Sequence, residues 1–429
     1  MSTTTPPRPR VLIVGGGWAG YELATSLSRT KYAITIAAPE RTSASTPLLA
    51  SAAVGLFTFS LAEEHIPTGN CHYLKSTVER IDFDSRTAKC RMVLPSHGLS
   101  AGDELIDVPY DILILAPGCA PNTFDTPGVS EHAIFIKTVR DARAVREQLF
   151  NRLDLACLPG TSDERQRELL HVAIVGGGPT GIELCAELSD LAHGPLTQLY
   201  PALAAKITIC IYDVADNILS AFDKDLWTYA NDQLVARAGV DISTGTHITR
   251  VDAEAMYTKE HGRVPYGMLI WATGNKAQPL IEHLAVAKRE KVHRILTDTR
   301  LRVFLPDPNN DIRPGSRFYD DVYALGDAAD IVGESLPTTA EVALQKARYL
   351  SRCLNAGFDR PFRYKDMPLT SYIGSHDGVT SQGGGRTGRT AWLAWRRGTL
   401  YWSRTRRVKV MIILTWIVNY LFERGISKS

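Results

Sequence analysis

The sequence has little cysteine, and none of it is paired at the spacing of a redox or zinc centre. Among 429 residues there are seven cysteines, and the closest two, Cys71 and Cys90, stand much further apart than a C-x-x-C pair. This spacing excludes reduction of a disulfide substrate by a cysteine pair and indicates no metal site. Scattered cysteines are also typical of a reducing compartment without structural disulfides.

The chain also lacks a long apolar run and an excess of charge of one sign. No stretch approaches the roughly 20 consecutive apolar residues of a membrane-spanning helix. Lysine and arginine number 48 against 46 acidic residues, so the net charge of +2 identifies no partner. The composition, with 44% hydrophobic residues, is ordinary for an α/β enzyme of two or three domains.

Acidic residues are absent from one long stretch near the C-terminus, between Asp377 and Glu423. More than half of the seven tryptophans lie there, and Val408–Phe422 is almost wholly apolar but too short to span a membrane. Together these features predict a segment that lies in the membrane interface, not a nucleic-acid surface. The alternative is a core helix with a basic rim at a homodimer interface. The basic residues are Arg386, Arg389, Arg396, Arg397, Arg404, Arg406, Arg407 and Lys409.

Two glycine-rich loops each follow a β-branched strand and precede a helix. In a G-x-G-x-x-G loop the first glycine makes the strand-to-helix turn and the second lets the backbone approach a pyrophosphate. The third lets the helix pack closely on the strand, and the helix N-terminus supplies N–H donors. Two such loops predict a flavoprotein in which one dinucleotide reduces another. The glycines are Gly15, Gly17 and Gly20 in the first loop and Gly176, Gly178 and Gly181 in the second.

Acidic residues stand near both loops. Asp213 ends the strand after the second loop, where a carboxylate accepts from ribose hydroxyls and repels a 2′-phosphate, so NADH is favoured over NADPH. Glu40 stands two residues past the matching position after the first loop, and it is either a ribose ligand or a solvated loop charge. Glu183 falls in the expected first helical turn after Gly181, where the helix dipole alone would favour a carboxylate.

The two halves of the chain repeat one pattern of strand, glycine loop, helix and strand. Each half closes with a buried strand and a glycine turn, at 110–118 and 267–274. A further strand at 322–327 has no counterpart in the second half, so it must return to the first. It ends in Asp327, where an acid lies in the ligand crevice of a parallel sheet. Asp327 is expected to hydrogen-bond the ribityl chain of a flavin, the alternative being a helix N-cap.

The predicted fold is therefore α/β, with two Rossmann-like dinucleotide-binding domains, the second inserted in the first. A C-terminal membrane-associating region completes the chain. The predicted boundaries are 1–165 and 291–360 for a discontinuous FAD-binding domain, 166–290 for an NADH-binding domain and 361–429 for the C-terminal region.

Longer segments are more specific than a glycine loop. On the basis of these segments, nearly the whole chain resembles the type II (alternative, non-proton-pumping) NADH:quinone oxidoreductases of the two-dinucleotide flavoprotein superfamily. The eukaryotic branch is the more similar one. The resemblance implies electron transfer from NADH through non-covalent FAD to a membrane quinone, by a peripheral protein of the mitochondrial inner membrane. The segments are Thr46–Gly55, Pro121–Gly128, Gly176–Glu183, Ile218–Asp223, Trp271–Asn275, Leu336–Ala343 and Leu421–Ser427.

The resemblance also implies site residues. Glu183 would line the nicotinamide pocket. The quinone site of the family carries two glutamines four residues apart at the start of a helix, expected here over 336–355, and this chain has Glu341 and Gln345. FAD-contacting positions would be Gly15, Gly17, Trp18, Ala19, Gly20, Glu40, Thr46, Gly118, Asp327, Pro337, Thr338 and Thr339, and NADH-contacting ones Gly176, Gly178, Pro179, Thr180, Gly181, Asp213 and Gly274.

Two departures from the family pattern leave the electron acceptor open. Glu341 in place of glutamine puts a titratable group beside the flavin and the quinone, where it either serves in proton transfer or signals another acceptor. A lysine that many members carry after the Tyr-Ile-Gly segment is missing, and His376 and Asp377 stand there. The alternatives are a reductase with a protein acceptor, and a flavoprotein similar to apoptosis-inducing factor, whose redox state controls interactions.

Overall fold

The computed structural model describes residues 7–93, 105–307, 312–313 and 315–422, so most of the Leu421–Ser427 segment lies outside the described residues. The chain divides into two compact units, and each collects segments that are distant in sequence. Unit 1 contains the chain up to Ser43, His65–Ala120 and Asn275–Met367. Unit 2 contains Ala44–Glu64, Pro121–Gly274 and the chain from Pro368 onward.

Unit 1 is built on one large sheet in the order β22-β19-β20-β21-β8-β1-β2-β5-β6-β7. Strands β21, β8, β1, β2 and β5 run parallel, as the predicted Rossmann pattern requires. The bounds are β1 Arg10–Val14, β2 Ala33–Ala38, β5 His72–Asp82, β6 Thr87–Met92, β7 Leu105–Pro109, β8 Ile112–Leu115, β19 Ile295–Thr297, β20 Arg302–Phe304, β21 Phe318–Ala324 and β22 Ala329–Ile331.

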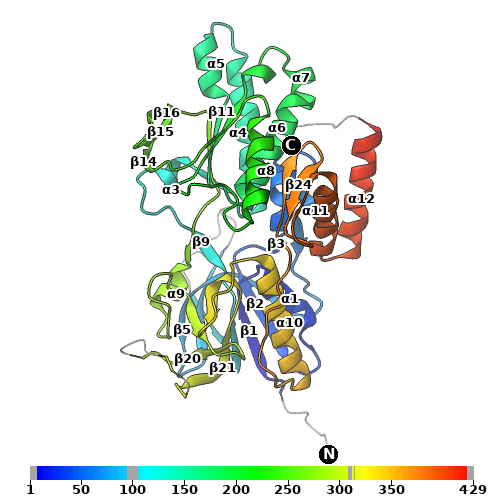
Figure 1. Ribbon diagram of the computed structural model, residues 1–429. Helices are drawn as coiled ribbons and strands as arrows, with labels where there is room; N and C mark the ends of the chain where they lie inside the picture. Colours follow the sequence, from blue (N-terminus) through cyan, green and yellow to red (C-terminus); the bar gives the residue numbers. More distant parts are fainter. Residues whose placement is uncertain (1–6, 94–104, 308–311, 314, 423–429) are drawn as a thin grey trace, which may run out of the picture. The chain divides into compact units, whose positions relative to one another are not determined.

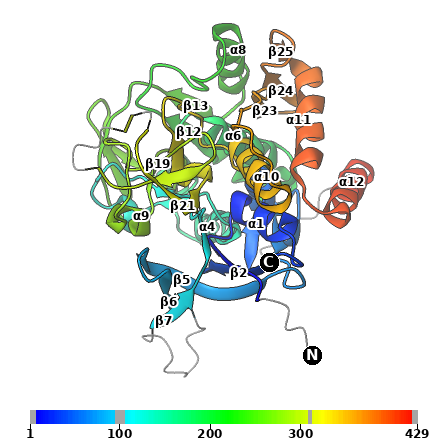
Figure 2. The same cartoon turned by 90° about the horizontal axis from the view of Figure 1, so that it is seen from below.

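Helices α1 (Trp18–Ser26) and α10 (Ala340–Ala356) lie side by side in both views of the molecule (Figures 1 and 2). Their apolar side chains join those of the parallel strands in one core, and a second core on other residues of the same strands includes Ile281 of α9 (Pro279–His283). The central strands are consequently buried on both faces, which explains their continuous apolar sequence. At the sheet edge, β5, β6 and β7 continue as an antiparallel ribbon (Figure 2).

The helix expected over 336–355 begins later, at Ala340. Thr339 is its N-cap, and its side chain accepts a hydrogen bond from the backbone N of Val342 at 3.3 Å. Leu336 precedes a proline, which disfavours the helical backbone there, and the threonine cap then fixes the start. Gly357, with φ +64°, ends the helix.

Unit 2 has a smaller parallel sheet in the order β10-β17-β11-β12-β13. A separate antiparallel sheet of β14, β15 and β16 belongs to the same unit. The strands are β10 Ile134–Phe135, β11 His171–Val175, β12 Thr208–Tyr212, β13 Val240–Ser243, β14 Ile248–Val251, β15 Ala255–Thr258, β16 Gly262–Pro265 and β17 Met268–Trp271. The helices are α2 Leu49–Ala53, α3 Val129–His132, α4 Val139–Ala156, α5 Asp163–Leu169, α6 Pro179–His193, α7 Pro195–Leu199 and α8 Lys224–Val235.

From Pro368 onward, the C-terminal region belongs to unit 2. It forms a three-stranded sheet and two helices, drawn in orange and red in Figure 1. Tyr372, Trp395 and Ile412 share one hydrophobic core with α6, which accounts for this packing. No helix of the described residues is long and apolar enough to cross a membrane. The elements are β23 Thr370–Gly374, β24 Asp377–Thr380, β25 Arg386–Thr387, α11 Gly388–Trp402 and α12 Arg406–Leu421.

Short elements complete the described chain. They are β3 Thr42–Ala44, η1 Thr46–Leu48, η2 Phe59–Leu61, β4 Glu63–His65, β9 Cys119–Pro121, η3 Ala204–Lys206, β18 Asn275–Ala277 and η4 Gly326–Ala328.

Candidate functional site

The first glycine loop leaves open space above its middle glycine only. Gly15 has φ +106°, and a Cβ built there would lie 2.3 Å from the carbonyl oxygen of Ala116. A Cβ on Gly20 would lie 1.9 Å from the carbonyl oxygen of Gly15. On Gly17 it would meet nothing within 4 Å. Packing therefore requires the outer two glycines, and the middle one lets a ligand reach the backbone.

The second glycine loop repeats this geometry in unit 2. Gly176 has φ +116°, and a Cβ there would lie 2.8 Å from the Cβ of Thr273. A Cβ on Gly181 would lie 2.0 Å from the carbonyl oxygen of Gly176, and one on Gly178 would meet nothing within 4 Å. Both loops thus have the shape that a dinucleotide pyrophosphate needs.

The helices after the two loops begin without a side-chain cap. The N-caps are Gly17 for α1 and Gly178 for α6, and Pro179 occupies the first turn of α6. Trp18 and Ala19 start α1, and Thr180 follows Pro179. Since no cap side chain engages the first-turn N–H groups, these donors and the positive end of the helix dipole are available to an anionic ligand.

Asp327 lies beside the first loop, within η4. A Cβ on Gly326 would be 3.7 Å from the Cβ of Ala19 and 3.8 Å from that of Ala343, so η4 packs between the starts of α1 and α10. The carboxylate of Asp327 accepts a hydrogen bond from Sγ of Cys119 at 3.3 Å, directly after Gly118. The N-cap of η4 is Leu325 and that of α10 is Thr339, so the alternative of Asp327 as an N-cap is wrong.

The remaining predicted FAD-contacting residues are more dispersed. Thr46 begins η1 in unit 2. Glu40 is exposed just past β2, and its carbonyl oxygen would be 3.8 Å from a Cβ on Gly16. Thr338 accepts a hydrogen bond from Nδ2 of Asn275 at 3.2 Å, and after Pro337 its neighbour Thr339 caps α10. The two hydroxyls thus have structural partners, and contact with the cofactor stays a prediction.

Asp213 lies against the second glycine loop, as its position after β12 predicts. Its Oδ2 accepts from the backbone N of Gly177 at 2.6 Å, and its Oδ1 accepts from the backbone N of Ala215 at 2.8 Å. Gly274 has φ +77°, and a Cβ there would lie 2.8 Å from the carbonyl oxygen of Asn122. The structure therefore brings Asp213 against the loop, and Thr273, which directly precedes Gly274, also lies close to Gly176.

Glu183 does not lie in the first turn of α6, because this helix already begins at Pro179. The expectation of a simple helix-dipole partner was wrong for this reason. Its Oε1 accepts from Nε1 of Trp395 at 3.0 Å and faces the backbone N of Tyr372 at 3.4 Å. Burial raises the pKa of Glu183 to about 8, and the charge of Glu187 adds to this, while the two hydrogen bonds oppose it. Burial therefore favours the protonated form of this carboxyl.

Glu341 and Gln345 lie on one face of α10, as their spacing predicts. Nε2 of Gln345 donates to Oε1 of Glu341 at 2.6 Å and to the carbonyl oxygen of Lys365 at 2.8 Å. The backbone N of Lys365 donates back to Oε1 of Gln345 at 2.9 Å. Glu341 is buried, and its Oε2 has no hydrogen-bond partner among the described residues. A buried carboxylate oxygen in this state is suited to a ligand group or a water molecule.

His376 and Asp377, which stand where many members of the similar family carry a lysine, both contact other residues of unit 2. The ring of His376 meets Trp392 edge-on, with centroids 5.0 Å apart. Asp377 accepts from the hydroxyl of Tyr229 at 2.8 Å. Within the C-terminal region, the groups that face Glu183 are the indole of Trp395 and the backbone N of Tyr372, and nothing in the local sequence indicates either contact.

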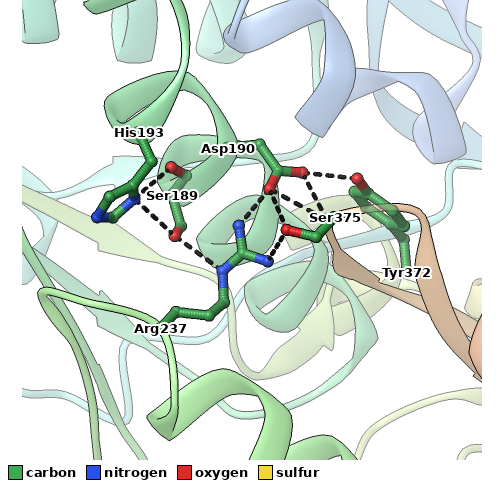
Figure 3. Close-up of polar contacts among 6 residues, drawn as sticks. All are labelled: Ser189, Asp190, His193, Arg237, Tyr372 and Ser375. Carbon is green, nitrogen blue, oxygen red and sulfur yellow. Dashed lines mark hydrogen bonds and ion pairs between the residues drawn. The ribbon is translucent and has the colours of Figure 1, made fainter. Parts of the chain in front are cut away.

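A polar cluster that the sequence did not predict holds β23 on α6 (Figure 3). Asp190 forms an ion pair with Arg237 and accepts from the hydroxyl of Tyr372 at 2.6 Å and the backbone N of Ser375 at 3.1 Å. Arg237 also donates to Ser189 and to Ser375, at 2.9 Å in each case. These five contacts around the Asp190–Arg237 pair hold β23 in a fixed position on α6.

Comparison with known proteins places these sites in context. Residues 9–347 match the sequence profile of the pyridine nucleotide-disulphide oxidoreductases. The chain is 30% identical to the mitochondrial internal alternative NAD(P)H-ubiquinone oxidoreductase A1 of Solanum tuberosum, over 100% of this chain and 89% of that protein. It is 29% identical to a probable NADH dehydrogenase of Dictyostelium discoideum, over 97% and 91%.

The fold matches that of a solved NDH2 from Plasmodium falciparum, in complex with NADH, with a TM-score of 0.86. The match covers 98% of this chain and 99% of that one at 21% sequence identity, so it shows a shared fold.

Proposed function

The chain belongs to the pyridine nucleotide-disulphide oxidoreductase family, and on this premise we propose that it passes electrons from NADH through FAD to a membrane quinone. The observation that carries the proposal is the pair of glycine loops, each closed by its outer glycines and open at the middle one. Similarity to alternative NAD(P)H-ubiquinone oxidoreductases over nearly the full length of both chains supports the quinone as acceptor. All seven cysteines are free thiols.

We assign FAD to the first loop, with Asp327, and NADH to the second loop, with Asp213, in the domains proposed from the sequence. Bound FAD supplies two-electron transfer between NADH and the quinone. The first-turn N–H groups of α1 and α6 bind the pyrophosphates, and Asp213 orients the ribose of NADH. Glu341 and Gln345 are proposed to line the quinone site, where the buried Glu341 carboxyl moves a proton to or from the quinone head.

Helix α12 is proposed to bind an anionic membrane surface. Its buried residues are Val408 and Ile412, while much of the rest of its apolar surface is exposed. We propose a peripheral location at the mitochondrial inner membrane, which the mitochondrial relatives support. The same surface could instead pair two copies of the chain. The exposed apolar residues are Val410, Met411, Ile413, Leu414, Ile417, Val418, Tyr420 and Leu421, close to Arg406, Arg407 and Lys409.

Substitution of Ile417 by glutamate is expected to weaken binding to anionic vesicles about tenfold or more, because burial of such a side chain contributes about 1.5–3 kcal/mol. The side chain is 49% exposed, so the fold should not change. Co-sedimentation with phosphatidylserine-containing vesicles measures the effect. Leu158→Glu is the matched control, since Leu158 is 55% exposed but lies outside the C-terminal region. Unchanged vesicle binding, together with loss of a dimer in light scattering, would instead favour the homodimer.

The proposed reaction is tested by stopped-flow spectroscopy of the FAD-loaded protein. NADH should bleach the flavin, and a short-chain ubiquinone should restore its absorbance orders of magnitude faster than oxygen does. Slow reoxidation by both acceptors would reject the quinone reductase and favour a protein acceptor or a redox-controlled interaction.

The same instrument tests Glu341. Glu341→Gln preserves an oxygen acceptor for Nε2 of Gln345 but removes the titratable group. Reoxidation by quinone is expected to slow about 10- to 100-fold, since general acid–base catalysis contributes at least this much. Reduction by NADH serves as the internal control and should not change. An unaltered oxidative rate would remove Glu341 from the proton path.

A further inference from the structure

We infer that Trp395 of helix α11 is a positioning residue of the NADH site, where its indole N–H fixes the Glu183 carboxyl. The C-terminal region would then complete the nucleotide site as well as bind the membrane. The inference rests on the proposed function for one point only, that Glu183 faces the nicotinamide ring. Everything else in it comes from contacts within unit 2.

Two groups from the C-terminal region hold the carboxyl of Glu183. Nε1 of Trp395 donates to Oε1 at 3.0 Å, and the backbone N of Tyr372 approaches the same oxygen at 3.4 Å. The ring of Trp395 stacks on that of Tyr372, with centroids 5.0 Å apart and an interplanar angle of 24°. Trp395 is only 8% exposed, so its ring has little freedom to rotate. The indole N–H therefore has one fixed direction, and that direction is toward Glu183.

Tyr372, on which Trp395 stacks, is itself held to α6. The hydroxyl of Tyr372 donates to Asp190, two turns after Glu183 on the same helix. Figure 3 shows Tyr372 and Ser375 converging on Asp190 from β23 and its turn. Helix α6, strand β23 and helix α11 thus form a closed set of contacts, which positions Trp395 without help from a ligand.

Few other titratable groups act on Glu183. Glu187 lies one turn along α6 and accepts from Ser51 at 2.6 Å. On the other elements packed against α6, His171 of β11 bonds Thr208, Lys206 of η3 bonds Gln166, and Cys210 and Tyr212 lie in β12. No cation of the described residues forms an ion pair with Glu183, so its hydrogen-bond donors are two uncharged groups, the indole of Trp395 and the backbone N of Tyr372.

This arrangement has a consequence for the two forms of the nucleotide. The nicotinamide ring of NAD+ is positively charged and that of NADH is uncharged, so an ionised Glu183 favours NAD+. The pKa of Glu183 is raised to about 8 by burial, and the hydrogen bond from Trp395 opposes that rise. Removal of the N–H donor therefore moves the pKa of Glu183 further upward.

The test uses Trp395→Phe, which retains an aromatic ring over Tyr372 but has no N–H. NAD+ affinity of the oxidised, FAD-loaded protein is measured by calorimetry from pH 6 to pH 10, roughly spanning the Glu183 titration. Affinity should rise through an inflection near pH 8 in the parent protein. In Trp395→Phe the inflection should move upward by about one pH unit, the size expected for a hydrogen bond to a charged group.

Two further variants make the result decisive. Glu183→Gln should abolish the inflection. Trp392→Phe is the matched control, because Trp392 lies on the same helix but contacts His376 and Arg396, and its inflection should stay in place. An unmoved inflection in Trp395→Phe, or an equal movement in Trp392→Phe, would overturn the inference. No quinone is present, so failure of quinone reduction leaves this result intact, whereas absence of any NAD+ binding would reject the proposed function itself.

Discussion

Replacement of Gly178 by alanine is expected to abolish NADH binding and to leave the fold unchanged. A Cβ at this position meets no protein atom within 4 Å, and the backbone angles of φ −75° and ψ 175° suit any residue. The added methyl group would occupy the space through which a pyrophosphate reaches the backbone N–H groups of the loop. We expect NADH affinity to fall more than about 100-fold, with no change in the thermal midpoint. Calorimetric titration and a melting curve measure the two quantities.

The other glycines of the loop provide the contrast. A Cβ on Gly181 would lie 2.0 Å from the carbonyl oxygen of Gly176, so Gly181→Ala must separate the helix from the strand. Such overpacking costs about 1–3 kcal/mol, and this variant should lose stability as well as binding. Gly69→Ala is the neutral control, because a Cβ there also meets nothing within 4 Å but no nucleotide loop is involved. Normal NADH binding by Gly178→Ala would contradict the assignment of NADH to the second loop.

Gly17→Ala should act on FAD in the same way, because both loops share one geometry. This shared geometry was predictable from the sequence, since the strand, the glycine spacing and the helix are all encoded within a few neighbouring residues. The common face of Glu341 and Gln345 was predictable for the same reason, because residues four apart on a helix are neighbours. The parallel order of the central strands followed from the repetition of the same local pattern in both halves.

What the sequence could not predict depends on contacts between distant segments. Glu183 and Trp395 are 212 residues apart, and no local pattern pairs a helical glutamate with a tryptophan from an apparent membrane segment. Buried Lys346 is a second example: its Nζ donates to the carbonyl oxygen of Ala329 at 3.1 Å, and burial lowers its pKa to about 8. The charge of its side chain would assign a lysine to the surface.

The membership of the C-terminal region in unit 2 is a related case. Its tryptophans and basic residues predicted a membrane segment. The same composition gave no sign that Trp395 and Ile412 are buried in the core around α6. The face of a helix that packs on its own protein and the face that is exposed to solvent can both be apolar. Only the tertiary structure distinguishes them, because the hydrophobic effect is the same for either.

The polar cluster around Asp190 and Arg237, which holds β23 on α6, is expected to contribute more to stability than any other polar contact described. Asp190→Ala should lower the free energy of unfolding by about 2–4 kcal/mol, since loss of one partner of a partly buried ion pair leaves the other charge uncompensated. The side chains of Arg237 and Asp190 are only 14% and 20% exposed, so solvent screens the pair weakly. The substitution also deprives the Tyr372 hydroxyl and the Ser375 backbone N of their acceptor.

Urea denaturation followed by tryptophan fluorescence measures this loss. Glu168→Ala is the matched control, because Glu168 pairs with Arg165 at 2.8 Å in a more exposed position and such pairs contribute about 0–1 kcal/mol. Asp190→Asn should lie between the two, since an amide keeps one oxygen acceptor but loses the charge. If Asp190→Ala were no less stable than Glu168→Ala, the Asp190 cluster would contribute no more to stability than an exposed ion pair does. The Trp395–Glu183 contact would then need another source of rigidity, because Tyr372, on which Trp395 stacks, is held to α6 through Asp190.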